Sequence, residues 1–231
     1  MSCDSATLIS IETSTELASV ALLHQGQRFS RESLGAQTHS ATVPGMLQSV
    51  LKEAGIRLSD CDAIAFGAGP GSFTGVRTAC GLAQGLAFGA KLPVVPVVTL
   101  LAMAERARAA GSNNVLSILD ARMGEVYWAQ YQFADRWHTV TAPTLSRASQ
   151  VKASGVPSVC GNGVTAYPND LLHLESSQLL PEVMPHARDL LNLALEAISE
   201  GKALNAREAQ PLYLRNKVAL TTRERTAGVS A

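Results

Sequence analysis

The sequence predicts an α/β protein of two similar lobes, each a mixed β-sheet with helices packed against it. Two short apolar stretches, and a third segment after the turn at Gln25-Gly26, open the chain and favour antiparallel strands, after which strands alternate with helices up to Ala110. The same order of elements restarts at Asn114. We therefore expect one lobe from residues 1–110 and another from residues 111–231, with the last helix or tail packed back on the first lobe.

Elements of the first lobe follow from apolar spacing and from turn residues. Val43, Leu47 and Val50 recur at intervals of three and four, which predicts an amphipathic helix that ends at Gly55. Ser72 is the expected N-cap of a second helix, which follows a glycine-rich turn. In order, we expect strands 7–11, 17–23 and 27–33, helix 40–54, strand 62–67, helix 73–91, strand 92–98 and helix 100–110.

Signals in the second lobe are sparser. Apolar residues at Leu190, Leu191, Ala194 and Ile198 share one face of a helix near the C-terminus. We expect strands 114–120, 125–133, 137–141 and 157–160, followed by helix 185–200. The two lobes share an order of elements, although no repeat is visible residue by residue.

Composition excludes several classes of protein. Nineteen basic and nineteen acidic residues cancel, so the whole surface attracts neither nucleic acid nor membrane. A hydrophobic fraction of 46% with only 16% charged residues indicates a compact chain with surplus apolar surface. The four cysteines are scattered, no signal segment opens the chain, and no apolar stretch is long enough to span a bilayer. We expect a reduced, cytoplasmic protein without a membrane span.

Few motifs carry chemistry. The turn 69–75 lies between a strand and a helix, where backbone N–H groups can hold an anion, yet it matches neither a P-loop nor G-x-G-x-x-G. Its serine stands one place too early for a nucleophile elbow. The five histidines form no H-x-x-x-H pair, so we expect no metal site. Glu12 and Asp120 end the first strand of each lobe, where a carboxylate can hold a metal-nucleotide, act as a base or merely cap a turn.

The helix 73–91 is the most unusual element, because Arg77 and Lys91 are its only charged residues. One face can cover the sheet, and the opposite face needs a partner. That partner is the helix 40–54 or another subunit, and an ordinary internal helix is the third option. The candidate interface consists of Val43, Met46, Leu47, Val50, Phe73, Val76, Cys80, Ala83 and Ala87. Close approach of a second backbone is favoured by glycines at spacing four, Gly81, Gly85 and Gly89.

A basic segment lies near the C-terminus. Between positions 202 and 225, six basic residues stand against Glu208 and Glu224, a local balance of +4; the six are Lys202, Arg207, Arg215, Lys217, Arg223 and Arg225. Such a segment can touch phosphate, although most charged tails are only solvated. A free-standing tRNA-binding module is therefore one functional class that the chain allows.

Four motifs are specific when taken together. They are ISIETST at 9–15, GPGSFTGVR at 69–77, DARMGEVY at 120–127 and PLYLR at 211–215. With these motifs the chain resembles the TsaB (YeaZ) family, bacterial proteins of transfer-RNA threonylcarbamoyladenosine synthesis. The resemblance spans nearly the whole chain and implies two ribonuclease-H-like lobes of the actin, Hsp70 and sugar-kinase (ASKHA) type.

The resemblance implies a non-catalytic scaffold subunit without a cofactor. In this family the subunit pairs with a TsaD-like catalytic paralogue. That enzyme transfers the threonylcarbamoyl group from threonylcarbamoyl-adenylate to N6 of the adenosine next to the anticodon, in tRNAs that read codons beginning with A. A TsaE-like ATPase joins the complex, tRNA binds through the complex, and the chain forms a homodimer when alone. The helices 40–54 and 73–91 are the implied interface.

One departure from TsaD bears on this role. The metal-binding histidine pair of TsaD falls on Thr99 and Met103, which cannot replace it. The kinase-like fold also implies a vestigial phosphate site made of Glu12, Thr13, Ser14, Gly69, Gly71, Ser72, Asp120 and Arg122. The alternative function is a small-molecule kinase or a metal-independent peptidase of the same fold, the latter suggested by an older family label.

Overall fold

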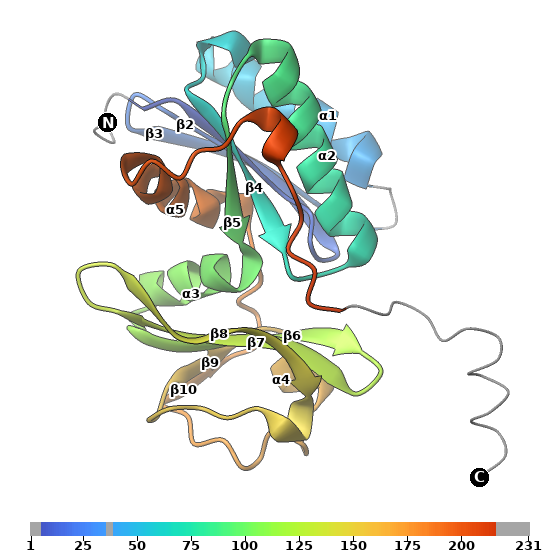
Figure 1. Ribbon diagram of the computed structural model, residues 1–231, viewed down its shortest axis with the longest axis vertical. Coiled ribbons are helices and arrows are strands. Elements are labelled where there is room, and N and C mark those ends of the chain that lie inside the picture. The colour runs from blue at the N-terminus through green and yellow to red at the C-terminus, as the bar shows by residue number, and fades with distance from the viewer. Residues whose placement is uncertain (1–5, 36–38, 216–231) are drawn as a thin grey trace, which may run out of the picture.

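Two five-stranded mixed sheets form the frame of the molecule (Figure 1). The structure, a computed structural model, describes residues 6–35 and 39–215. The strand order is β3-β2-β1-β4-β5 in the first sheet and β8-β7-β6-β9-β10 in the second, so both sheets repeat one order. In each sheet the first three strands are antiparallel, and the last two run parallel to the first. The predicted pair of ribonuclease-H-like lobes is confirmed.

The strands follow the apolar stretches of the sequence. The first sheet contains β1 (Leu8–Glu12), β2 (Leu17–His24), β3 (Gln27–Leu34), β4 (Ala63–Gly69) and β5 (Val94–Val98). The second contains β6 (Asn114–Arg122), β7 (Glu125–Phe133), β8 (Trp137–Arg147), β9 (Ser158–Cys160) and β10 (Gln178–Leu180). Strands β1 and β4 are buried throughout, because helices cover both faces of the first sheet. Strand β8 is longer than predicted, and β10 was not predicted.

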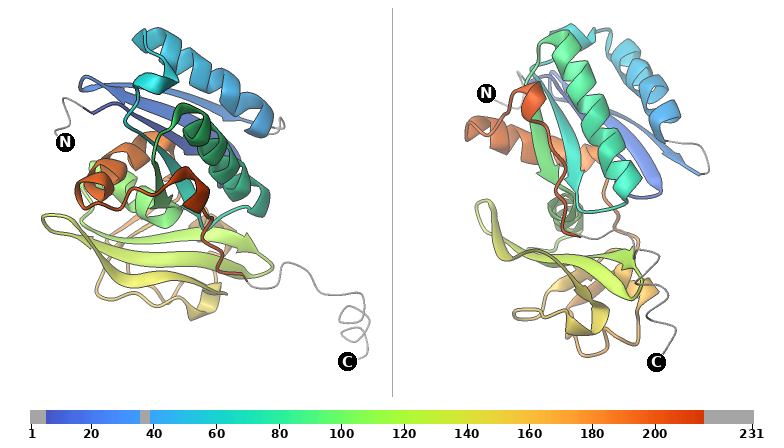
Figure 2. Two further views of the ribbon diagram at one scale, coloured as in Figure 1. Left: turned by 45° about the horizontal axis from the view of Figure 1, so that its top comes forward. Right: turned by 45° about the vertical axis from the view of Figure 1, so that its right-hand side comes forward.

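The helices lie in layers around the two sheets. Their bounds are α1 (His39–Ala54), α2 (Phe73–Ala90), α3 (Thr99–Ala109), α4 (Gly163–Ala166) and α5 (Ala187–Ser199). Helices α1 and α2 lie side by side on the outer face of the first sheet (Figures 1 and 2). The predicted N-cap of α2 is confirmed, because the Ser72 hydroxyl accepts a hydrogen bond from the Gly75 N–H.

The last helix of each lobe packs on the sheet of the other. Leu190 and Ala194 of α5 share an apolar cluster with strands of the first sheet. Met103 and Ala107 of α3 share a cluster with strands of the second sheet. Helices α5 and α3 therefore fill the space between the two sheets (Figure 1). The division of the chain at residue 110 stays a prediction.

After a 3-10 turn at Ala206–Glu208, residues 209–215 run in extended form from the first lobe to the second (Figure 1). We call this segment the strap. The Leu212 N–H donates to the Ala68 carbonyl of β4 at 2.7 Å. The Arg215 guanidinium pairs with the Glu125 carboxylate of β7 at 2.6 Å. The strap therefore bonds to both sheets. Among the helices within the described ranges, none combines the length and apolar character that crossing a membrane requires.

Candidate functional site

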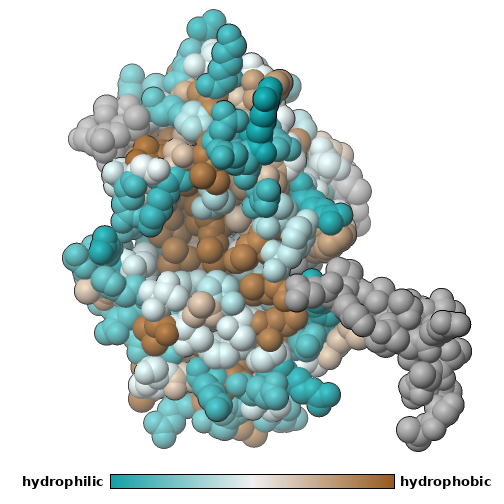
Figure 3. Space-filling view, viewed as in Figure 1, coloured by the Kyte–Doolittle hydropathy of each residue, from teal (hydrophilic) through white to brown (hydrophobic). Residues whose placement is uncertain are grey.

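The two lobes enclose a cavity of about 400 Å³ at the edge where the strap crosses. Its walls come from the β1–β2 turn, the β4–α2 turn, the β6–β7 hairpin and the strap. Apolar side chains gather in the hollow between the lobes, whereas the outer surfaces are mostly hydrophilic (Figure 3). A cleft of this size with a few polar groups is suited to a small ligand or a peptide segment.

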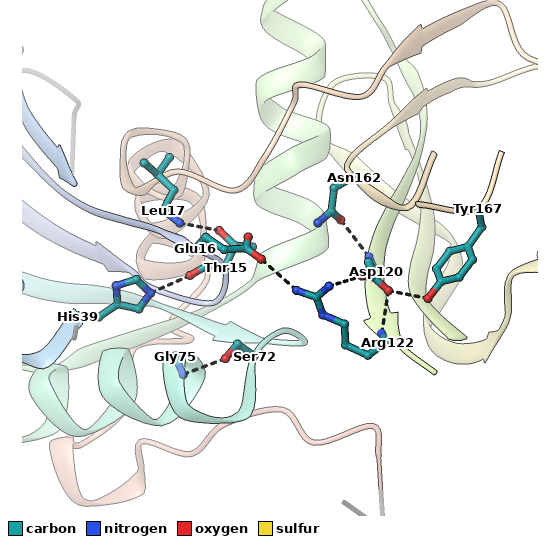
Figure 4. A network of polar contacts seen from close by, with 10 residues as sticks. All are labelled: Thr15, Glu16, Leu17, His39, Ser72, Gly75, Asp120, Arg122, Asn162 and Tyr167. Carbon is teal, nitrogen blue, oxygen red and sulfur yellow. Dashed lines mark hydrogen bonds and ion pairs between the residues drawn. The ribbon is translucent and has the colours of Figure 1, made fainter. Parts of the chain in front are cut away.

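Asp120 is the centre of the polar network on the second-lobe side (Figure 4). Its Oδ1 accepts hydrogen bonds from the Arg122 backbone N–H at 2.7 Å and from the Tyr167 hydroxyl at 2.8 Å. Its Oδ2 lies 3.2 Å from Nη1 of Arg122, and its own N–H donates to the Asn162 side chain at 2.9 Å. The carboxylate is thus held by three donors, which leaves it poorly placed to act as a free base.

The first-lobe side of the cavity is built from the β1–β2 and β4–α2 turns. The Ser72 N–H donates to the Ser14 carbonyl at 2.7 Å, which brings the two turns together. Gly71 is required at this contact, because a Cβ there would overlap the Ser14 backbone and Cβ. The Ser14 hydroxyl is buried without a hydrogen-bond partner, and the Ser72 hydroxyl caps α2. Neither serine is bonded to a histidine, the general base that most often activates a serine nucleophile.

Five of the eight residues assigned to the phosphate site meet at the cavity, namely Ser14, Gly71, Ser72, Asp120 and Arg122. Glu12, Thr13 and Gly69 do not line it, which corrects their assignment. The Thr13 hydroxyl donates to the Gly75 carbonyl at 2.7 Å, and the Gly69 N–H donates to the Thr99 hydroxyl at 3.2 Å. The Thr13 hydroxyl and the Gly69 N–H are therefore both engaged in hydrogen bonds inside the protein.

Glu12 is fully buried beneath the turn rather than exposed at a strand end. Its Oε1 accepts the Ser14 N–H at 2.6 Å, and its Oε2 has no partner. Burial raises the pKa of Glu12, although the hydrogen bond from the Ser14 backbone N–H opposes that shift. A ligand for a nucleotide-bound cation must be ionised and accessible, whereas Glu12 is fully buried and its pKa is shifted in the direction that disfavours ionisation.

Sequence reasoning missed the cluster that Tyr213 of the strap forms with Phe73 and Arg77 of α2 beside the cavity. The Arg77 guanidinium lies 3.7 Å from the centroid of the Phe73 ring and 5.5 Å from that of the Tyr213 ring. Its Nε donates to the Tyr213 hydroxyl at 2.7 Å. Phe73 and Tyr213 nevertheless remain 42% and 47% exposed. These residues belong to the motifs at 69–77 and 211–215, but no spacing rule links the two motifs.

The candidate interface residues of α1 and α2 occupy two different environments. Met46 is half-buried and Phe73 is exposed. Six others lie in the core between the helices and the first sheet: Val43, Leu47, Val50, Cys80, Ala83 and Ala87. Val76 is also buried and lines the cavity. These buried residues therefore form the apolar stripe of α1 and α2 that covers the sheet, and their assignment to a partner surface was wrong. The alternating spacing identifies a buried stripe but not the element that buries it.

The opposite face of α2 is open. Gly81, Gly85 and Gly89 are exposed, and a Cβ built on any of them would meet no atom within 4 Å. Phe88, near the C-terminal end of the helix, is 61% exposed. The outer face therefore combines a shallow glycine groove with exposed aromatic rings, and α1 lies beside it without covering it (Figure 2).

The two positions aligned with the TsaD histidines lie in the core. Thr99 and Met103 are fully buried, and the Thr99 hydroxyl is occupied by the Gly69 N–H. In residues 6–35 and 39–215, no group of three histidine, cysteine or acidic side chains is arranged to hold a metal ion. The three cysteines there, Cys61, Cys80 and Cys160, are buried free thiols.

The basic segment is only partly described. Lys202 pairs with Glu200 at 2.5 Å, and Arg215 pairs with Glu125 in the strap. Arg207 lies 5.5 Å from the Phe88 ring. Lys217, Arg223 and Arg225 fall outside the described residues. Two of the three described basic residues are thus paired with carboxylates, and contact of the segment with tRNA stays a prediction.

Comparisons with known proteins agree with these observations. A family model described as TsaD, tRNA N6-adenosine threonylcarbamoyltransferase, matches residues 33–166. The tRNA threonylcarbamoyladenosine biosynthesis protein TsaB of Escherichia coli K12 is 41% identical, with 92% of this chain and 96% of that protein covered. The chain belongs to the TsaB family. TsaB of Haemophilus influenzae is 37% identical over 92% of this chain and 94% of that protein.

Solved structures of the same family share the fold. YeaZ from Pseudomonas aeruginosa superposes with a TM-score of 0.84 at 39% identity, covering 90% of this chain and all of that one. A further P. aeruginosa structure, described as an uncharacterized protein similar to the peptidase YeaZ, gives 0.86 at 39% identity and covers 91% of this chain and all of that one. The resemblance stated from the four motifs is confirmed, and this member of the TsaB family carries a TsaD-type domain.

Proposed function

We propose that this chain is a non-catalytic subunit in threonylcarbamoyladenosine synthesis on tRNA, and that it supports a TsaD-type transferase. The observation that carries the proposal is the burial of Glu12 and of the two positions aligned with the TsaD histidines. Glu12, Thr99 and Met103 are all fully buried, and burial raises the pKa of Glu12. We infer the pathway from the TsaB relatives, which are described as tRNA threonylcarbamoyladenosine biosynthesis proteins. A TsaE-like ATPase and tRNA then belong to the larger complex, in the cytoplasm.

The outer face of α2, with α1 beside it, is the proposed partner surface. Gly81 and Gly85 leave room for a second backbone, and Phe88 offers apolar area to a partner. In the absence of the TsaD-type partner, the same face supports a homodimer. This proposal replaces the buried candidate interface residues of α1 and α2 with exposed residues that a partner can reach.

Size-exclusion chromatography with light scattering tests the proposal on this chain, on the TsaD-type protein of the same organism and on their mixture. A mixed complex should form, and tRNA threonylcarbamoylation by the TsaD-type protein should require it. Gly81→Arg should abolish the complex while leaving the monomer folded, because the new side chain meets only solvent in the monomer. Gly81→Ala is the matched control and should bind nearly as well. A chain that ignores the partner, or threonylcarbamoylation without it, would overturn the proposal.

The kinase alternative rests on the cavity alone. Its phosphate-facing candidates still include Asp120, Arg122 and the α2 N-terminus, but Glu12 is removed from the set. We propose that the chain has no nucleotide cofactor of its own. Isothermal titration with ATP and Mg²⁺ tests this proposal. Tight binding by the isolated chain would contradict it and support the kinase alternative. The peptidase alternative needs a nucleophile that a neighbouring general base activates. The hydroxyls of Ser14 and Ser72 are not bonded to such a base.

A further inference from the structure

The exposed ridge of α2 is divided into two unlike halves. Phe73, Arg77, Gly81, Gly85 and Gly89 recur every four residues and therefore form one row along the helix. The strap covers the N-terminal half of this row through Tyr213, which packs beside Phe73 and Arg77. The glycine half is open. A partner helix lying in the glycine groove would meet the Tyr213 side chain at the end of the groove.

Tyr213 is held firmly although its ring is nearly half exposed. The Arg77 guanidinium bonds to its hydroxyl and lies over the neighbouring Phe73 ring, with the two ring centroids 6.1 Å apart. Such a cluster keeps an amphipathic aromatic surface ordered in the free chain. Ordered aromatic side chains that remain exposed are the residues that most often dominate protein interfaces.

The position of Tyr213 depends on both lobes. On one side of it, the Leu212 N–H bonds to Ala68 of β4 at 2.7 Å. On the other side, the Arg215 guanidinium bonds to the Glu125 carboxylate at 2.6 Å and to the Ala121 carbonyl at 3.0 Å. A shift of the second lobe relative to the first would therefore pull on the residue that flanks the groove.

From these contacts we propose that Tyr213 completes the partner surface of α2, and that Arg215 couples binding of the TsaD-type partner to the closed arrangement of the two lobes. This inference rests on the proposed function, and the shared TsaD-type domain is the reason for naming that partner. Coupling of this kind is reciprocal: the partner stabilises the seated strap, and a loosened strap lowers the affinity for the partner.

Affinity measurements with three substitutions test the contact and the coupling separately. Tyr213→Ala should weaken binding of the TsaD-type protein about tenfold or more, because it removes an ordered aromatic anchor. Arg215→Ala does not change the α2 face, yet it should weaken binding severalfold, because fewer molecules have the strap seated. Arg136→Ala is the matched control. It removes an arginine that pairs with Glu200 away from the strap and should leave the affinity unchanged.

Hydrogen exchange at the Leu212 amide gives a readout that a simple contact would not move. Adding the partner should slow exchange of this amide in the wild type, and Arg215→Ala should reduce that protection. A wild-type complex whose affinity is unaffected by both Tyr213→Ala and Arg215→Ala would overturn this inference alone. Absence of any wild-type complex would overturn the proposed function with it. A homodimer that depends on Tyr213 and excludes the TsaD-type protein would show that the named partner is wrong.

Discussion

Arg122 in the β6–β7 hairpin reaches across the cavity to Glu16 in the β1–β2 turn, with 3.3 Å between Nη2 and Oε1. The two side chains are 76% and 61% exposed, so solvent screens their attraction. Arg215 and Glu125 form a shorter pair at 2.6 Å and are only 18% and 34% exposed. The link through the strap is therefore the stronger of the two.

We expect the two links to contribute unequally to stability. Glu16→Gln should lower the free energy of unfolding by less than about 0.5 kcal/mol, as is typical of exposed ion pairs. Arg215→Ala removes charge-assisted hydrogen bonds to Glu125 and Ala121 and should cost about 1.5–3 kcal/mol. Urea unfolding of both variants measures the difference. Equal losses would show that the strap does not hold the lobes together.

The glycines of α2 should respond oppositely to the same substitution. Gly75→Ala should destabilise the protein strongly, by several kcal/mol, because the new Cβ would overlap the Thr13 carbonyl oxygen. Gly85→Ala places its Cβ in open space and should stabilise the helix by up to about 1 kcal/mol. Thermal unfolding of the two variants checks both signs. A neutral Gly75→Ala would mean that the β1–β2 turn does not approach α2 as closely as described.

Ala83→Glu should unfold the isolated chain rather than only weaken a partner complex. Ala83 is fully buried between α2 and the first sheet, and a charge there has no partner. The expected loss is about 3–5 kcal/mol. Circular dichroism with urea titration measures it, and Gln48→Glu on the exposed face of α1 is the control. A stable, folded Ala83→Glu monomer would contradict the position of the core.

Asp189 should give the fold a measurable dependence on pH. Burial raises the pKa of its carboxyl to about 6, even though Arg106 lies 3.8 Å away, and its Oδ2 accepts no hydrogen bond. The folded state therefore binds this proton more tightly than the unfolded state. The resulting stability is present below about pH 4 and is lost as the pH rises through about 6, by up to roughly 3 kcal/mol.

The isostere Asp189→Asn isolates this contribution. It should be more stable than the wild type at pH 7.5, and the difference should disappear near pH 4. Comparing urea unfolding of the two proteins cancels the effects of Glu12 and His186, whose pKa values burial also shifts, upward and downward respectively. Asp170→Asn, at an exposed position, is the control. If the free energies of unfolding of the wild type and Asp189→Asn changed with pH in parallel, that result would contradict a raised pKa of the Asp189 carboxyl.

Local signals predicted the long elements well, because strands such as β1 and helices such as α5 carry their own apolar period. Strand β10 and helix α4, of three and four residues, were missed. Elements this short have too few residues for a period and form through pairing with β9 and packing on β6. The glycine row of α2 was noted in the sequence, but its exposure was not predicted, since glycine rows look the same in a core and on a surface.

The candidate site was predictable where strand ends determine it. Ser14 follows β1 and Asp120 lies near the end of β6, the first strand of the second lobe, so topology brings them to one cavity. Glu12 differs because helices cover both faces of the first sheet, so that every side chain of β1 is buried, Glu12 included. Tyr213 could not be placed, since its segment is irregular and is positioned by Arg77, 136 residues away in the chain.

The repetition of the sheets is complete in strands and incomplete in helices. At the positions where the first lobe carries α1 and α2, the second lobe carries a 3-10 turn at Ala148–Gln150 and the four-residue α4. Within the described residues, one lobe alone thus presents a long helical pair with an open glycine face. A molecule built this way is monovalent through that face. Association through it ends at a closed pair and cannot extend into a filament, as it could if both lobes offered the same surface.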